Sequence, residues 1–150
     1  MPQSLASLPV HLVFSTKNRM PALVDSVRVD LHRYASAVLK GLGCRAMLVN
    51  SVDDHIHILF ELNRTISVSE VVEQVKTSTS RWIKKRGSPF GEFHWQGGYG
   101  AFGVSASDVA RISAYIRDQR EHHRVESFQE EFRDLLDSHG VAYDERYVWD

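Results

Sequence analysis

The chain has 150 residues, of which 43% are hydrophobic and 25% charged, as expected for one globular domain that spans residues 1–150. We see no apolar stretch long enough to cross a membrane and no signal peptide. The single cysteine, Cys44, excludes an intrachain disulfide, so we expect a cytoplasmic protein. The net charge of −1 argues weakly against a uniformly basic nucleic-acid-binding surface, although local clusters of cations matter more than the sum.

The chain begins with a predicted strand and a predicted helix. Residues 9–15 form a short apolar run that is typical of a strand. Apolar side chains then recur at helical spacing over residues 27–42, and Asp25 or Ser26 can cap that helix. A strand followed by an amphipathic helix is expected to pack as two layers around a core.

Two further strands follow. One is predicted over residues 44–52, where Cys44 is expected to be a small buried side chain, and the next over residues 55–62. Asp53 and Asp54, which lie between them, favour a tight turn. We therefore expect the two strands to be antiparallel neighbours.

The second half of the chain contains two sequences typical of helix N-termini. The segment from Ser67 to Glu70 is a capping box, which predicts a helix that ends near residue 87. A fourth strand is predicted over residues 99–105. A second capping box, over residues 105–108, then begins the third helix, and an amphipathic helix is expected around residues 127–138.

This order, β-α-β-β-α-β with additional C-terminal helices, predicts an α+β, ferredoxin-like (RRM-like) fold. Its sheet is antiparallel, and two helices cover one face. We expect the opposite face to be left open, which would make it a platform for a ligand.

The third predicted strand carries a candidate metal site. Every second residue from Ile56 to Leu62 is apolar, and that face is expected to pack against the helices. His55 and His57 lie on the other face, about 7 Å apart along the strand, so both imidazoles can reach one divalent ion. A bare His-x-His pair is more often two partly exposed histidines, and two histidines alone make a poor site.

The third predicted helix carries the groups that such a site lacks. Tyr115 and Gln119 are four residues apart and so share one helix face, where the Gln119 carbonyl oxygen can complete the ligand set. A tyrosine hydroxyl is a weak nucleophile unless a nearby cation stabilises the phenolate. Taken alone, Tyr115 is more often a half-buried packing residue. His122 and His123 are candidates for contacts near the same site or with DNA, and the remaining histidines are expected to be structural or exposed.

Charged side chains cluster in two regions. The acidic residues lie near the C-terminus, at Glu126, Glu130, Glu131, Asp134 and Asp137. By charge alone, either cluster is interpreted as a solvated helix face. The cations are candidate contacts to nucleic-acid phosphates, and they are Lys17, Arg19, Arg81, Lys84 and Lys85.

Together these segments resemble the single-tyrosine HUH transposases of bacterial and archaeal insertion sequences, where HUH denotes two histidines that flank one bulky apolar residue. The similarity lies in residues 11–19, in the Asp54-His-Ile-His57 segment, in residues 95–99, in the segment from Tyr115 to His123, and in the ending over residues 127–147. The His-x-His pair is unspecific, but its combination with a tyrosine helix at this order and spacing is specific.

The resemblance implies a function as well as a fold. Members of the family are homodimers that bind hairpins in single-stranded DNA, use Mg²⁺ or Mn²⁺ and need no ATP. The tyrosine helix of one subunit can complete the active site of the other. Carried over residue by residue, His55, His57 and Gln119 would be metal ligands, and Tyr115 the catalytic nucleophile that forms a 5′-phosphotyrosine intermediate.

Three alternatives remain open at this stage. A non-catalytic RNA-binding module of the RRM type shares the topology but stacks bases on sheet aromatics, whereas this strand offers histidine and glutamate. A catalytically silent protein that binds nucleic-acid hairpins would keep the fold without the chemistry. A metal-dependent hydrolase would use water in place of Tyr115. A covalent adduct between protein and DNA would exclude all three.

Overall fold

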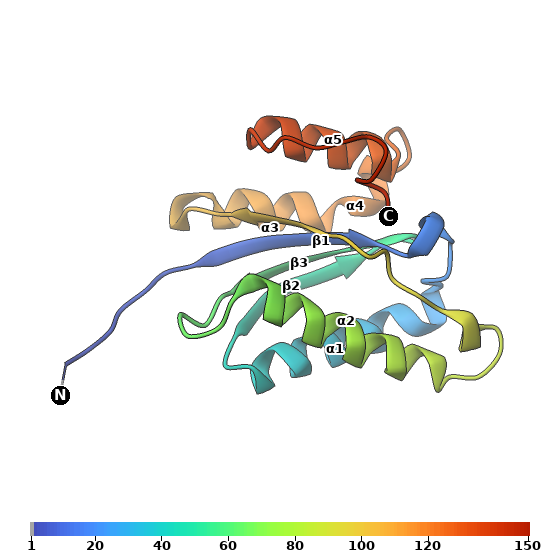
Figure 1. The fold of residues 1–150 in the computed structure, drawn as a ribbon, viewed down its shortest axis with the longest axis horizontal. Coiled ribbons are helices and arrows are strands. Elements are labelled where there is room, and N and C mark those ends of the chain that lie inside the picture. Colours follow the sequence, from blue (N-terminus) through green and yellow to red (C-terminus); the bar gives the residue numbers. More distant parts are fainter. Residues whose placement is uncertain (1) are drawn as a thin grey trace.

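The computed structural model describes residues 2–150, and its centre is a four-stranded antiparallel sheet in the order β2-β3-β1-β4 (Figure 1). The strands are β1 (Pro9–Ser15), β2 (Arg45–Ser51), β3 (His55–Glu61) and β4 (Gly100–Gly103). This strand order confirms the predicted ferredoxin-like arrangement, because β1 and β3 are the two central neighbours.

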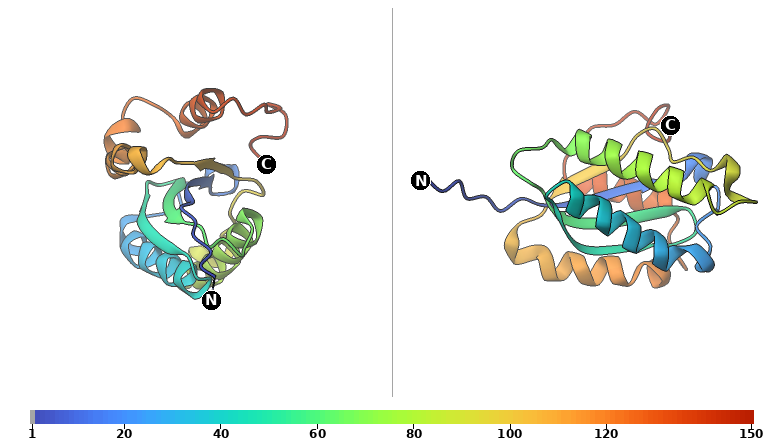
Figure 2. Two further views of the ribbon diagram at one scale, coloured as in Figure 1. Left: turned by 90° about the vertical axis from the view of Figure 1, so that its left-hand side faces the viewer. Right: turned by 90° about the horizontal axis from the view of Figure 1, so that it is seen from below.

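Two long helices cover one face of the sheet, as predicted: α1 (Asp25–Gly41) and α2 (Val68–Lys84) (Figures 1 and 2). The alternate apolar side chains of β1 and β3, including Phe14, Ile58 and Phe60, form a fully buried core with them. The Ser67 hydroxyl accepts a hydrogen bond from the Glu70 backbone N–H, so the first predicted capping box is confirmed.

The predicted N-terminal caps of α1 and of the third predicted helix are wrong. Helix α1 begins at Asp25, and its N-cap position is occupied by Val24, which offers no side-chain cap. The Ser105 side chain makes no cap bond either: residues Ala106–Asp108 form a 3₁₀ turn, and α3 (Val109–Arg117) begins only after it. Both segments still turn into helices at the expected place because their apolar spacing is helical.

The second face of the sheet is covered, which corrects the expectation of an open platform. Helices α3, α4 (Gln119–His122) and α5 (Phe128–Ser138) lie across it, so the sheet is sandwiched between two helical layers (Figures 1 and 2). A second apolar cluster packs this layer against the sheet. Its buried members are Val13, Phe102, Phe128, Phe132 and Leu136. The histidines on this face of the sheet, His55 and His57, are therefore buried.

The C-terminal segment fastens α5 to the rest of the chain. Trp149 packs edge-on against Phe132, and its ring also lies under the Arg133 guanidinium. The carbonyl oxygen of Asp150 accepts a hydrogen bond from the Gly98 backbone N–H. These contacts fix the orientation of α5 above the sheet.

Within residues 2–150, no helix is long and apolar enough to cross a membrane. Cys44 is buried and free, and its sulfur accepts a hydrogen bond from the Asn63 backbone N–H, in agreement with its predicted packing role.

Candidate active site

The two histidines of β3 lie under the second helical layer and are fully buried. The Nδ1 atom of each ring has its own partner. His55 Nδ1 donates to the Asp54 carboxylate at 2.7 Å, and His57 Nδ1 lies 2.7 Å from Nε2 of His11 on β1. The Nε2 atoms of both rings are therefore left to face the space between β3 and the helices above it.

Tyr115 and Gln119 reach that same space from α3 and α4. The helix predicted to carry both residues is interrupted at Asp118, so Gln119 begins a new short helix. The two side chains still converge, because Gln119 Oε1 lies 3.2 Å from His55 Nε2. Asn50 on β2 anchors the segment through a hydrogen bond to the Ile116 carbonyl oxygen.

Glu131 of α5 lies at the centre of the site, although its sequence context predicts an exposed acidic residue. Its side chain is 1% exposed. Its Oε1 lies 3.1–3.2 Å from Nε2 of His55, His57 and His123. Its Oε2 accepts hydrogen bonds from the Tyr115 hydroxyl and from the Gln119 amide nitrogen. One carboxylate thus joins the phenol to the histidine pair.

The charge of Glu131 shifts the pKa values around it. Burial disfavours the charged form of His55, but hydrogen bonds to Asp54 and Glu131 outweigh this effect and raise its pKa from 6.5 to about 9. Burial would raise the pKa of Glu131, yet the hydrogen bonds from the three imidazoles lower it well below its usual value. Burial and the Glu131 charge raise the pKa of Tyr115, so the phenol is neutral at pH 7.

The donor atoms fit a divalent metal ion. The candidate ligand atoms of His55, His57 and Glu131 all lie within 4.8 Å of one another. Gln119 Oε1 adds a neutral oxygen beside His55 Nε2. Two imidazole nitrogens with two oxygens suit ions such as Mn²⁺, and each imidazole is oriented by a partner on its far nitrogen, as metal-binding histidines usually are.

The nucleophile candidate and the histidine pair meet within one chain. The Tyr115 ring lies edge-on to the His57 ring at 6.0 Å between centroids, and it packs against the His122 ring at 4.7 Å. In the described residues the phenol and both imidazoles thus come from one subunit.

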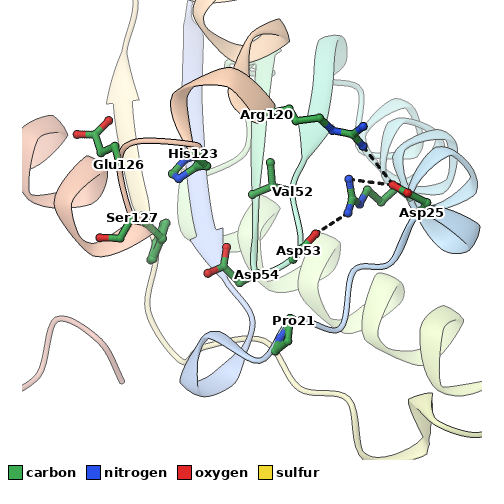
Figure 3. A pocket seen from close by; sticks show the side chains of 11 residues that line it. Pro21, Asp25, Val52, Asp53, Asp54, Arg120, His123, Glu126 and Ser127 are labelled. Carbon is green, nitrogen blue, oxygen red and sulfur yellow. Dashed lines mark hydrogen bonds and ion pairs between the residues drawn. The ribbon is translucent and has the colours of Figure 1, made fainter.

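A pocket of about 520 Å³ lies at the edge of this site (Figure 3). His123 and Asp54, which contact Glu131 and His55 respectively, form part of its lining. Arg28 pairs with Asp25 and Asp53 on another side of the pocket, and Arg120 also pairs with Asp25. The lining of this pocket is therefore mixed in charge, with both arginines paired to aspartates.

The five cations predicted to contact phosphates do not line this pocket. Lys17 and Arg19 lie in the 3₁₀ turn after β1, and the other three lie at the C-terminal end of α2. Both groups lie at the end of the molecule where β3 begins (Figure 1). Within residues 2–150 none of them forms an ion pair, so all five remain available to an external anion.

Sequence reasoning missed two residues of this site, and both left a signal. Glu131 lies three residues after Phe128 and four before Leu135, so helical spacing places its carboxylate on the apolar side of α5. The sequence alone predicts a structural or exposed His11. The predicted fold pairs β1 with β3, however, and the observed register sets Val13 opposite His57, which makes His11 its diagonal neighbour.

Comparisons with known proteins find one matching family model and two solved structures of similar fold. A family model described as "Transposase IS200 like" matches residues 4–119. A crystal structure of a proposed transposase from Deinococcus radiodurans R1 superposes with a TM-score of 0.62 at 23% identity, over 79% of this chain and 98% of the other. A REP-associated tyrosine transposase bound to a REP hairpin has a TM-score of 0.61 at 13% identity, over 82% and 72% of the two chains. At these identities the two structures support the fold. No curated protein sequence matches.

Proposed function

Since this chain belongs to the family of IS200-like transposases, we propose that it cleaves and rejoins single-stranded DNA through a covalent bond to Tyr115. The observation that carries the proposal is the Glu131 bridge. Its Oε2 accepts the Tyr115 hydroxyl hydrogen bond, while its Oε1 lies beside Nε2 of both His55 and His57. A phenol held one carboxylate away from a metal-binding histidine pair suits attack on a phosphodiester.

In this proposal His55, His57 and Gln119 hold an Mg²⁺ or Mn²⁺ ion, and Glu131 supplies a further oxygen ligand. The ion would polarise the scissile phosphate and offset the negative charge that raises the pKa of the phenol. The Nδ1 hydrogen bonds of the histidines and the amide contact of Gln119 with Glu131 keep these ligands in place.

The chain's own residues then carry out the transfer. The Tyr115 oxygen bonds to phosphorus, the bond from phosphorus to the 3′ oxygen breaks, and the phenol proton ends on the released 3′ hydroxyl. The phosphotyrosine linkage keeps the energy of the diester, so another 3′ hydroxyl can reverse the step and join new ends. Glu131 Oε2 holds the hydroxyl of Tyr115 toward the site before attack.

The DNA is proposed to be a single strand that carries a hairpin, as in the REP-hairpin complex of the similar structure. Lys17 and Arg19 on one side, and Arg81, Lys84 and Lys85 on the other, are proposed to hold its phosphates. Their unpaired state and their position at the end of the sheet where β3 begins support this assignment.

We further propose that residues 1–150 act as one domain. The family model ends at residue 119, but α5, which lies beyond it, brings Glu131 into the site. The location is proposed to be the cytoplasm, where DNA is accessible and Cys44 stays reduced.

A homodimer is proposed from the family resemblance alone. If each subunit builds its own site, a mixture of Tyr115→Phe and His57→Ala proteins should form no adduct with DNA. Restored activity in the mixture would instead mean that tyrosine helices are exchanged between subunits.

The function is tested by trapping the covalent intermediate. The protein is incubated with Mn²⁺ and a labelled library of hairpin-containing single strands, then run on a denaturing gel. We expect a labelled protein band with the wild type and with the control Tyr143→Phe, and none with Tyr115→Phe, which should still bind hairpins. Hairpin binding without any adduct by the wild type would support the catalytically silent alternative, and a Tyr115→Phe adduct would contradict the nucleophile assignment.

A further inference from the structure

His11 contacts one of the two proposed metal-binding histidines from the neighbouring strand. It is 1% exposed, and its Nε2 lies 2.7 Å from His57 Nδ1. The two rings are stacked, with 5.0 Å between their centroids and 23° between their planes. Because β1 and β3 are the central strands of the sheet, this contact is held by the backbone ladder on both sides.

Which of the two rings donates this hydrogen bond depends on whether His57 Nε2 carries a proton or binds a metal ion. His57 Nε2 lies 3.1 Å from the Glu131 carboxylate and donates to it, so in the tautomer protonated on Nε2 alone, Nδ1 accepts a hydrogen bond from His11 Nε2–H. A metal ion on Nε2 needs the lone pair there, so the His57 proton would lie on Nδ1 and His11 would become the acceptor.

The partner of His55 differs in this respect. The Asp54 carboxylate only accepts hydrogen bonds, so it holds the His55 proton on Nδ1 whether or not Nε2 has a ligand. An imidazole can donate or accept through the same nitrogen, according to its tautomer. His11 is therefore a suitable partner for His57, whose proton lies on Nε2 without metal and on Nδ1 when Nε2 binds metal.

We propose that His11 is a positioning residue for the metal site, which orients the His57 ring and accepts a hydrogen bond from its Nδ1–H when Nε2 binds metal. The inference rests on the proposed function, since it concerns the same metal site. It assigns a role to a buried side chain outside the proposed ligand set.

The test compares two substitutions that differ in hydrogen bonding. His11→Gln keeps an acceptor near the position of Nε2, whereas His11→Leu fills the space without any polar atom. The matched control is His32→Leu, because His32 of α1 is a half-buried histidine that is hydrogen-bonded to Ser51 and not to a residue of the site. Mn²⁺ affinity is measured by titration calorimetry on the full chain, and circular dichroism checks that each variant is folded.

We expect His11→Leu to weaken Mn²⁺ binding about 10- to 100-fold, His11→Gln to recover most of that loss, and His32→Leu to bind like the wild type. Equal Mn²⁺ affinity of the folded His11→Leu and wild-type proteins would overturn the inference and leave the proposed function intact. Equal losses in His11→Leu and His11→Gln would also overturn it, since packing alone would then explain the effect. If the wild type itself bound no Mn²⁺, the proposed metal site would fail and this role of His11 with it.

Discussion

Replacing Glu131 with alanine should destabilise the metal-free protein far more than its place in an acidic segment suggests. The carboxylate is buried, and it accepts hydrogen bonds from three imidazoles, from the Tyr115 hydroxyl and from the Gln119 amide. Removing one partner of a buried ionic network costs about 3–5 kcal/mol, because the remaining charge is left uncompensated. At about 2–4 °C per kcal/mol for a chain of this size, the Tm should fall by roughly 6–20 °C.

The assay is thermal unfolding in the presence of a chelator at pH 7, where His55 is charged. The control is Glu130→Ala on the exposed side of the same helix, which should cost less than about 1 kcal/mol. Because the pKa of His55 is raised from 6.5 to about 9, its pairing stabilises the fold fully below pH 6.5 and less as the pH rises through 9. The difference between the wild type and Glu131→Ala should therefore shrink at high pH. Equal stability of the Glu131→Ala and Glu130→Ala proteins at pH 7 would refute the reasoning.

Three further predictions concern packing, acid stability and DNA binding. A Cβ atom at Gly100 would overlap the buried Phe132 ring, whereas Gly103 on the same strand has no atom within 4 Å of that position. Gly100→Ala should therefore cost about 1–3 kcal/mol in denaturant unfolding, and an effect no larger than that of Gly103→Ala would contradict this packing. Burial and Arg28 lower the pKa of His32 to about 4, so stability falls between pH 6.5 and 4 as only the unfolded chain takes up the proton. His32→Gln should make that fall shallower, and an unchanged pH profile would disagree. Lys84→Ala should reduce the slope of log affinity against log salt for a single strand by about 0.7, while Lys40→Ala, at the other end of the molecule, should leave the slope unchanged. An unaltered slope for Lys84→Ala would remove it from the DNA surface.

The sheet and its first helical layer could be predicted because the relevant signals are local. Strand alternation, helical spacing and turn residues identify each element, and the element order then selects one of few topologies. The capping residues were less informative: Val24 precedes α1 without a side-chain cap, and a 3₁₀ turn replaces the second capping box. Tertiary packing evidently determines where those helices begin.

The second helical layer could not be predicted to the same extent, because its position depends on contacts between distant segments. The apolar stripe of α5 was recognised, but not that it packs on the sheet face that carries His55 and His57. The sequence alone therefore places Glu131 on a solvated acidic helix face. The pairing of Tyr115 with the histidines was expected from family resemblance, and the carboxylate between them is visible only in three dimensions.

Anomalous diffraction from crystals soaked in Mn²⁺ tests the central claim most directly, namely that one chain gathers the phenol and the metal ligands. We predict an anomalous peak within bonding distance of Nε2 of His55 and His57 and of oxygens from Gln119 and Glu131, with the Tyr115 hydroxyl of the same chain still hydrogen-bonded to Glu131. A site without a peak, or one in which Tyr115 of the same chain lies far from Glu131, would contradict the account.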